Sequence, residues 1–416
     1  MRADARLGMR MIVAVYFALA LGFAIGVTRT ILTPDGVVAT DFTVFWTGWW
    51  LILHGQADGL YNEAAQRATQ QALMNGFSFQ GGLMAFLNPP HAALAGLPFG
   101  WLADHAGERV AFIAWTCVSV ALLLSLDRRL RETLALTEGP ARWIATSALL
   151  AFYPVFHTLN VGQMSILLAV AALGLHRAVD TSRPRAGAAW FLALTIKPQL
   201  LPGVVVFLIA RRCWRLLAYA TAALASAAAL TAVVLGPAIW LDYARQVGRL
   251  EHFFAQGTPV HMVNLRGSLT RALGSSAQPS IDAMAYGIWI VAALVVAGLF
   301  AYRRIHEAAD TRAAYALALA VALLSSPHLF VQDAVVWTVP LVLYTAALRD
   351  SGADARAFVS FVLSVPILFA VVRLVDLAGD HGPRLRIDPL VVALIVATVA
   401  IARGVVNRTG LHTLHP

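Results

Sequence analysis

Long apolar runs are the feature that most limits how this chain can fold. About a dozen of them follow one another along 416 residues, of which 59% are hydrophobic and 13% charged, whereas soluble domains usually carry about 25% charged residues. A run of about 18 apolar residues can cross the hydrocarbon core of a bilayer. Because lipid offers no partner for an unpaired backbone group, spanning segments must be helices. We therefore expect an all-α, multi-pass integral membrane protein.

The apolar runs leave too little polar chain for a separate soluble domain, so we expect one transmembrane domain over residues 1–416. Two stretches with more polar residues, 33–82 and 237–282, interrupt the series as a first and a second outer loop. The expected membrane segments are 11–32, 83–102, 109–126, 143–159, 163–177, 186–210, 216–236, 283–302, 313–326, 333–348, 356–377 and 388–403.

Basic residues gather in short clusters between the apolar runs, which is typical of cytoplasmic loops and not of a nucleic-acid surface, although the net charge is +9. If all twelve segments cross, both termini lie inside and both long loops outside, but the Arg-containing loops 127–142 and 178–185 also fall outside. In an alternative arrangement, segment 83–102 dips in and returns at its Pro-Pro pair, and 186–210 breaks at Lys197-Pro198. Both arrangements agree on the termini and the long loops.

The first outer loop contains two helical patterns. The stretch 42–54 is too short to span, and its Trp46, Trp49 and Trp50 suit the headgroup region, so we expect a helix that lies on the outer interface. The polar stretch 62–74 predicts a second surface helix. Together they would form a shelf over the mouth of a cavity in the membrane.

Asp41 follows the first span directly, in Ala39-Thr40-Asp41-Phe42. One interpretation makes it the N-cap of the following helix, because Asp accepts hydrogen bonds well from the first backbone amides. The other makes it a general base at the boundary between water and lipid. The two roles are compatible.

Lys197 is the single Lys among 31 basic residues, and it stands in an apolar run before Pro198. A charged group at membrane depth costs several kcal/mol unless it is paired or reaches a wet cavity. It could extend to the interface or bond to carbonyls that Pro198 frees. A chain that otherwise uses Arg throughout also suggests a need for a compact ammonium here, for which a phosphate is a natural partner.

Other polar residues stand at the edges of apolar segments. His328 and Asp333 follow Ser325-Ser326-Pro327, either as part of a capped helix end or as contacts to a substrate or phosphate. Gln163, Asn264 and Arg266 are weaker candidates for substrate binding. Because Asp41 has no close acidic neighbour, and hard divalent cations usually need several carboxylates, we expect no metal.

Five segments, in order, resemble glycosyltransferase family 87, which is also catalogued as a domain of unknown function (DUF2029). That family is similar to the polyprenol-phosphate-mannose-dependent α-1,2-mannosyltransferases of actinobacteria. The segments are DFTVFWTGWWLILHGQADGLY from Asp41, NPPHAALAGLP from Asn88, GQMSILLAVAALGL from Gly162, LALTIKPQLLPGVVVFLIARRCWR from Leu192 and SSPHLFVQDAVVWTVPL from Ser325.

The resemblance implies a GT-C-type polytopic helical bundle in the cell membrane, with its active site facing the periplasm or exterior. It implies an inverting hexosyltransferase that moves a sugar, with mannose expected, from a polyprenyl-phosphate donor to a hydroxyl of a lipid- or glycan-linked acceptor. Asp41 would be the base, and Lys197, His328, Arg266, Gln163, Asn264, Tyr61 and Asp333 would contact substrate. The partners would be the lipid-linked donor, the acceptor and membrane lipids, with no cofactor and no nucleic acid.

A multi-span transporter, or a flippase for lipid or polysaccharide, is the competing class. Such a protein would be expected to carry an internal repeat and several ionisable residues at the membrane midplane. The sequence shows no internal repeat and only Lys197 as such a residue. This pattern favours the transferase.

Overall fold

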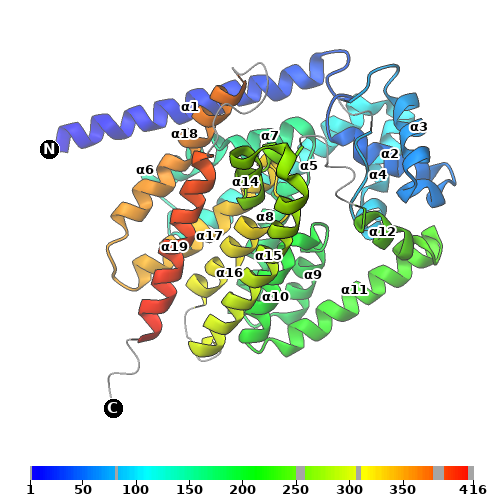
Figure 1. The fold of residues 1–416 in the computed structure, drawn as a ribbon. Helices are drawn as coiled ribbons and strands as arrows, with labels where there is room; N and C mark the ends of the chain where they lie inside the picture. Colours follow the sequence, from blue (N-terminus) through cyan, green and yellow to red (C-terminus); the bar gives the residue numbers. More distant parts are fainter. Residues whose placement is uncertain (1, 80–82, 250–257, 306–310, 378–387, 411–416) are drawn as a thin grey trace.

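The computed structural model describes residues 2–79, 83–249, 258–305, 311–377 and 388–410, and every regular element among them is a helix (Figure 1). The longest are α1 (Arg2–Leu32), α5 (Glu108–Thr133), α11 (Trp214–Leu235), α15 (Gln278–Tyr302), α18 (Arg356–Leu377) and α19 (Pro389–Gly410). The all-helical prediction is confirmed.

The number of membrane spans is smaller than expected. By length and composition, seven helices of the described residues could cross a membrane: the six above, and η6 (Val331–Trp337) continued by α17 (Thr338–Asp350). An eighth span results if α6 (Pro140–Leu150) and α7 (Tyr153–Val161), which meet at a bend of 50°, are counted together. The expectation of about twelve is therefore not supported.

Broken and short helices account for the difference. The apolar run 186–210 divides into α9 (Pro184–Leu194), η2 (Pro198–Leu200) and α10 (Leu201–Ala210). This is the break that Lys197-Pro198 predicted, since Pro lacks an N–H and its ring clashes with the preceding turn. The run 83–102 becomes α4 (Pro90–Ala106), which starts inside the Pro-Pro pair. The runs 163–177 and 313–326 become α8 (Ser165–Asp180) and α16 (Arg312–Ser325), with only 16 and 14 residues.

The core surrounds α16, a helix of mostly alanine and leucine whose side chains are nearly all buried. Helices α10, α15, α17 and α19 pack around it. The small residues allow close approach: a Cβ atom on Gly203 of α10 would lie 2.1 Å from the carbonyl oxygen of Ala318. A helix of this length is too short to be read as a span, and protein rather than lipid covers it.

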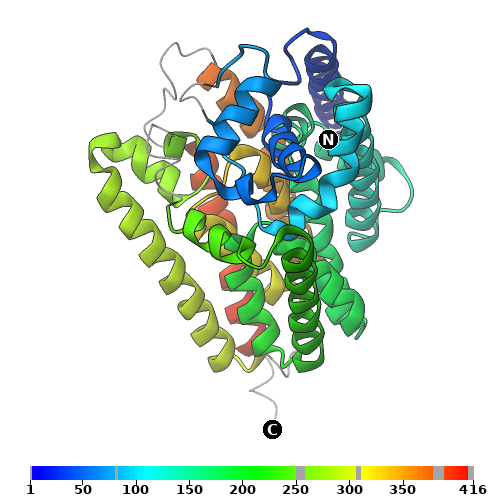
Figure 2. The same ribbon diagram turned by 90° about the vertical axis from the view of Figure 1, so that its right-hand side faces the viewer.

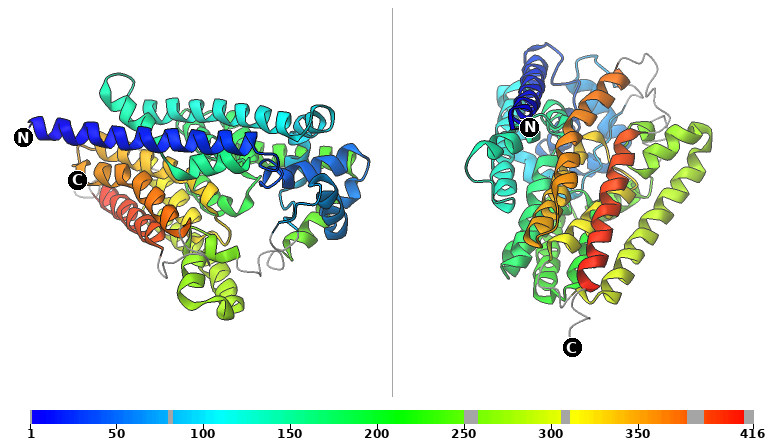
Figure 3. Two further views of the ribbon diagram at one scale, coloured as in Figure 1. Left: turned by 90° about the horizontal axis from the view of Figure 1, so that it is seen from above. Right: turned by 90° about the vertical axis from the view of Figure 1, so that its left-hand side faces the viewer.

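The two long loops meet on one side of the molecule. The first contains α2 (Phe42–Leu53), η1 (Ala57–Tyr61) and α3 (Glu63–Leu73), and the second contains α12 (Ile239–Val247), η3 (Thr258–His261), α14 (Leu265–Leu273) and η4 (Ser275–Ala277). Figures 1 and 2 show α2, α3 and α12 together, and the start of α1 and the end of α19 lie on the other side. In Figure 3, α18 and α19 lie beside each other on the face away from α2 and α3.

Helix α2 forms where it was expected, but its surroundings differ from the prediction. Trp46 and Trp49 are buried in the protein rather than placed among headgroups. Trp49 packs on α4, where Gly96 and Gly100 leave room for the indole ring. The sequence could not reveal this, because an apolar aromatic stripe suits a lipid interface and a helix–helix contact equally well.

Replacing Gly96 by alanine should destabilise the protein, because the new Cβ atom would lie 2.2 Å from the indole of Trp49. Overpacking of this kind typically costs about 1–3 kcal/mol. Gly22→Ala on α1 is the matched control, since its Cβ atom would meet nothing within 4 Å. Thermal melting of the purified variants measures the difference, and equal melting temperatures for the two would contradict the packing described here.

Candidate active site

Asp41 stands at the N-cap position of α2, but its side chain does not cap the helix. Instead, its Oδ2 accepts a hydrogen bond of 2.7 Å from the side-chain amide of Gln163. Gln163 follows Gly162, which ends α7 in a left-handed conformation and packs against Phe42. The interpretation of the Asp41 carboxylate as a helix cap is therefore wrong. Its role as a general base stays a prediction.

Lys197 lies at the break between α9 and α10 and forms an ion pair with Oδ1 of Asp333. The same oxygen accepts a hydrogen bond of 2.6 Å from the hydroxyl of Ser165, the first residue of α8. Side-chain exposure is 13% for Lys197 and 2% for Asp333, so the pair is enclosed by protein. Lys197 is thus paired with a carboxylate rather than extended toward the membrane surface.

These groups act on one another electrostatically. Burial raises the pKa of Asp41 above its ordinary value, while the hydrogen bond from Gln163 and the charge of Lys197 act in the opposite direction. The negative charge of Asp333 adds to the increase in this pKa. A carboxylate whose pKa is raised is a stronger proton acceptor once it is ionised.

A second polar group forms around Arg266, which is 1% exposed. Its guanidinium pairs with Asp282 on α15 at 2.6 Å and contacts Nδ1 of His328 at 3.2 Å. The other ring nitrogen of His328 lies 2.9 Å from the hydroxyl of Tyr286. His328 is therefore oriented from both sides, by a cation and by a phenol.

The short helix η2 joins the two groups. Its residue Gln199 donates a hydrogen bond of 3.2 Å to the carbonyl oxygen of His328 and accepts one of 3.3 Å from the indole of Trp289. Since Lys197 immediately precedes η2, the break in the apolar run places one cation beside Asp333 and positions the backbone that carries His328.

Asn264 and Tyr61, which were predicted to contact substrate, form hydrogen bonds within the protein. The Asn264 side chain caps α14 by accepting from the Gly267 amide at 2.8 Å and donates to the carbonyl oxygen of Ser326. The hydroxyl of Tyr61 donates to the carbonyl oxygen of Asn88 at 2.7 Å, and its ring packs against Tyr243 where the two outer loops meet. Both residues thus hold the loops that border the site.

Four residues of the site were not predicted from the sequence: Ser165, Gln199, Asp282 and Tyr286. Ser165 and Gln199 lie within the family-like segments that begin at Gly162 and Leu192, so their position beside Gln163 and Lys197 was a usable signal. Asp282 and Tyr286 open an apolar run and gave no such signal. Within the described ranges, no three His, Cys, Asp or Glu side chains converge on a metal-sized site.

Comparison with known families identifies the family of the chain. The model of glycosyltransferase family 87 matches residues 86–327, more than half of the chain, so the protein belongs to this family. It is therefore a membrane glycosyltransferase by family. The match includes Gln163, Lys197 and Arg266 but starts after Asp41. Searches of curated proteins and of solved structures gave no significant match.

Removing Asp333 should destabilise the fold more than removing both members of its ion pair. Asp333→Asn leaves the ammonium of Lys197 buried without its counter-charge, a change that typically costs about 3–5 kcal/mol. The double variant Lys197→Met/Asp333→Asn should recover part of this loss. Thermal melting of the wild type, both single variants and the double variant completes the cycle.

The exposed pair of Glu63 and Arg67, at 2.8 Å on α3, provides the control for this cycle. Glu63→Gln should change stability by less than about 1 kcal/mol, because solvent screens such pairs. A double variant that melts no higher than Asp333→Asn would show that pairing with Lys197 is not what Asp333 contributes.

Proposed function

We propose that the chain transfers a hexose, with mannose expected, from a polyprenyl-phosphate donor to a hydroxyl of a lipid- or glycan-linked acceptor. The reaction would invert the anomeric centre, with Asp41 as general base. Family membership supports the transfer of a sugar rather than transport. The observation that carries the proposal is the carboxylate of Asp41, which is held by the amide of Gln163 and not used as a helix cap.

The chemistry requires a base on one face of the sugar and a cation on the other. The acceptor hydroxyl must lose a proton as it attacks the anomeric carbon, and a carboxylate within hydrogen-bond reach can take it. The phosphate leaves on the opposite face with its negative charge. Fixed positive charge and hydrogen-bond donors aimed at that position would stabilise the transition state.

Lys197 is the proposed donor to the phosphate, and His328 would join it by giving up its contact with the hydroxyl of Tyr286. Lys197 is held by Asp333 alone among the acidic residues described, and an ammonium has three N–H groups to share. Arg266 is nearly inaccessible and bonds to the imidazole of His328, so we assign it a positioning role through that ring. Gln163 would likewise have a positioning role, through its hydrogen bond to Asp41.

The proposed location is the outer side of the cell membrane. The loops that border the site lie away from the start of α1 and the end of α19 (Figure 1), and the distribution of Arg predicts that both ends of the chain lie in the cytoplasm. A donor embedded in the outer leaflet would then present its sugar at the level of Asp41, between the end of α1 and the start of α2.

Replacing Asp41 by asparagine should reduce transfer by about 10²–10⁴, the usual loss when a well-placed base is removed. The amide keeps the size of the side chain but cannot accept the proton, so binding of the donor should survive. Transfer to a lipid acceptor and equilibrium binding of the donor are measured on the same preparation. Asp58→Asn, at an exposed position of η1, is the matched control. Near-normal transfer by Asp41→Asn would remove it from the mechanism.

Replacing Gln163 by leucine should move the acid limb of the pH–rate profile to higher pH. The hydrogen bond from Gln163 lowers the pKa of Asp41, so its loss raises that pKa. Activity that depends on the ionised carboxylate then disappears earlier as the pH falls. The profile of kcat/KM against pH measures this shift. A lower rate with an unmoved acid limb would mean that Gln163 does not act through Asp41.

A further inference from the structure

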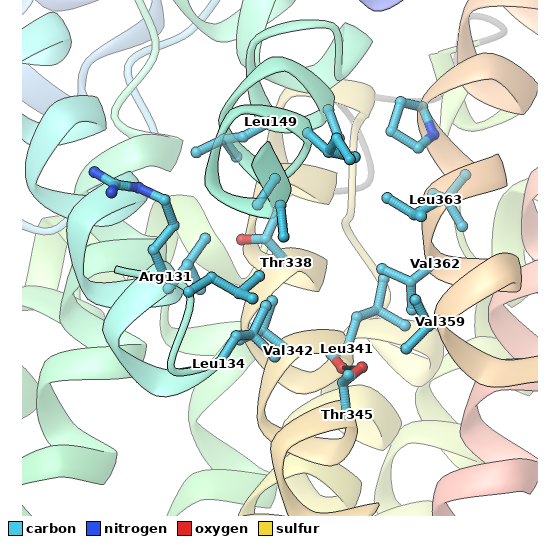
Figure 4. A pocket seen from close by; sticks show the side chains of 18 of the residues that line it. Arg131, Leu134, Leu149, Thr338, Leu341, Val342, Thr345, Val359, Val362 and Leu363 are labelled. Carbon is cyan, nitrogen blue, oxygen red and sulfur yellow. Dashed lines mark hydrogen bonds between the residues drawn. The ribbon is translucent and has the colours of Figure 1, made fainter. Parts of the chain in front are cut away.

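An apolar cavity of about 420 Å³ lies between α5, α6, α17 and α18, apart from the polar site. Figure 4 shows Leu134 and Leu149 on one side of it and Val359, Val362 and Leu363 on the other. The bend between α6 and α7 contributes to this space, since Phe152 at the bend also lines it. Water gains nothing in such an apolar space, whereas a hydrocarbon chain would fill it with favourable contacts.

The cavity follows the length of α17. Along α17 its lining runs from Thr338 to Arg349, which corresponds to about 16 Å of helix. This length is close to one leaflet, since the whole hydrocarbon core is about 30 Å thick. The Arg349 end lies at the turn into α18, on the side of the molecule where α19 also ends (Figure 3).

The charge at that end is positive. A shallow polar depression adjoins the cavity and shares Arg349 and Val359 with it. Arg356 and Asp354 also line the depression, so its charged lining residues are two Arg and one Asp. Arg349 donates to the carbonyl oxygen of Leu134 and, among the described residues, has no ion-pair partner. The side chain of Arg356 is 94% exposed, with Asp354 at 3.9 Å.

We propose that this cavity binds one acyl chain of an anionic phospholipid from the leaflet on the side of the termini. Its phosphate would lie in the depression near Arg349 and Arg356. Basic pockets between membrane helices are known to select anionic headgroups in this way. The lipid would fill the cavity beside the bent α6–α7 pair and pack against α17. Helix α17 directly continues η6, which contains Asp333.

The position of the charges distinguishes this lipid from the glycosyl donor. Under the proposed function, the donor phosphate lies beside Lys197 and His328, on the other side of the membrane from Arg349. A donor tail in the cavity would place its apolar end, not its phosphate, at the two Arg residues. The lipid site is a separate proposal, and its test uses binding rather than sugar transfer.

The experiment uses the purified full-length protein, delipidated and then supplied with dioleoylphosphatidylglycerol, dioleoylphosphatidylcholine or a polyprenyl phosphate. Native mass spectrometry measures the bound lipid. We expect one phosphatidylglycerol to be retained in preference to phosphatidylcholine. Arg349→Gln and Arg356→Gln should each reduce this preference by about fivefold, the contribution of one Arg near an anionic surface.

Ala148→Trp fills the cavity from α6 and should abolish retention of phosphatidylglycerol. Val291→Trp, on the exposed face of α15, is the matched control and should retain it. If Ala148→Trp does not fold, Arg356→Gln decides the question alone, because its side chain is almost fully exposed. Displacement of phosphatidylglycerol by polyprenyl phosphate would overturn the proposal, and so would equal retention of both phospholipids.

Discussion

The ion pair between Lys197 and Asp333 is the constraint on which the centre of the structure depends. An ammonium at membrane depth needs a counter-charge or water, and here it finds a carboxylate that Ser165 also binds. The pair joins the break after α9 to the start of η6, two segments separated by more than one hundred residues. These interrupted segments carry backbone groups that protein must cover, and the enclosed helices α8 and α16 pack against them.

The sequence predicted the helical class, and one of its two arrangements predicted the break at Lys197, because each has a local cause. Pro198 interrupts a helix, and a single Lys in an apolar run requires a partner. It did not predict that partner, since Asp333 lies far away in the chain and α9, η6 and α8 meet only in three dimensions. The number of spans was overestimated for a related reason: an apolar run has the same composition whether lipid or protein surrounds it.

The surroundings of α2 illustrate the same limit. Trp46 and Trp49 are suited to headgroups by chemistry, yet both lie inside the protein because α4 offers a surface of glycine against which an indole can pack. That fit depends on the relative placement of two helices separated by a long loop. The hydrogen bond from Gln163 to Asp41 could not be predicted for the same reason. It joins two loops that are far apart in the chain, and no sequence pattern connects them.

The distribution of buried charge gives a reason for proposing Asp41 rather than Asp333 as the base. Among the described residues, Asp333 is paired with Lys197, and Asp282 with Arg266, so each of these carboxylates already has a cationic partner. Asp41 has no ion-pair partner in this part of the chain; a neutral amide holds it, and burial raises its pKa. A carboxylate bound to a cation gains little by accepting a proton, because it would lose that interaction. The carboxylate without such a partner is the one that can accept a proton at the lowest cost.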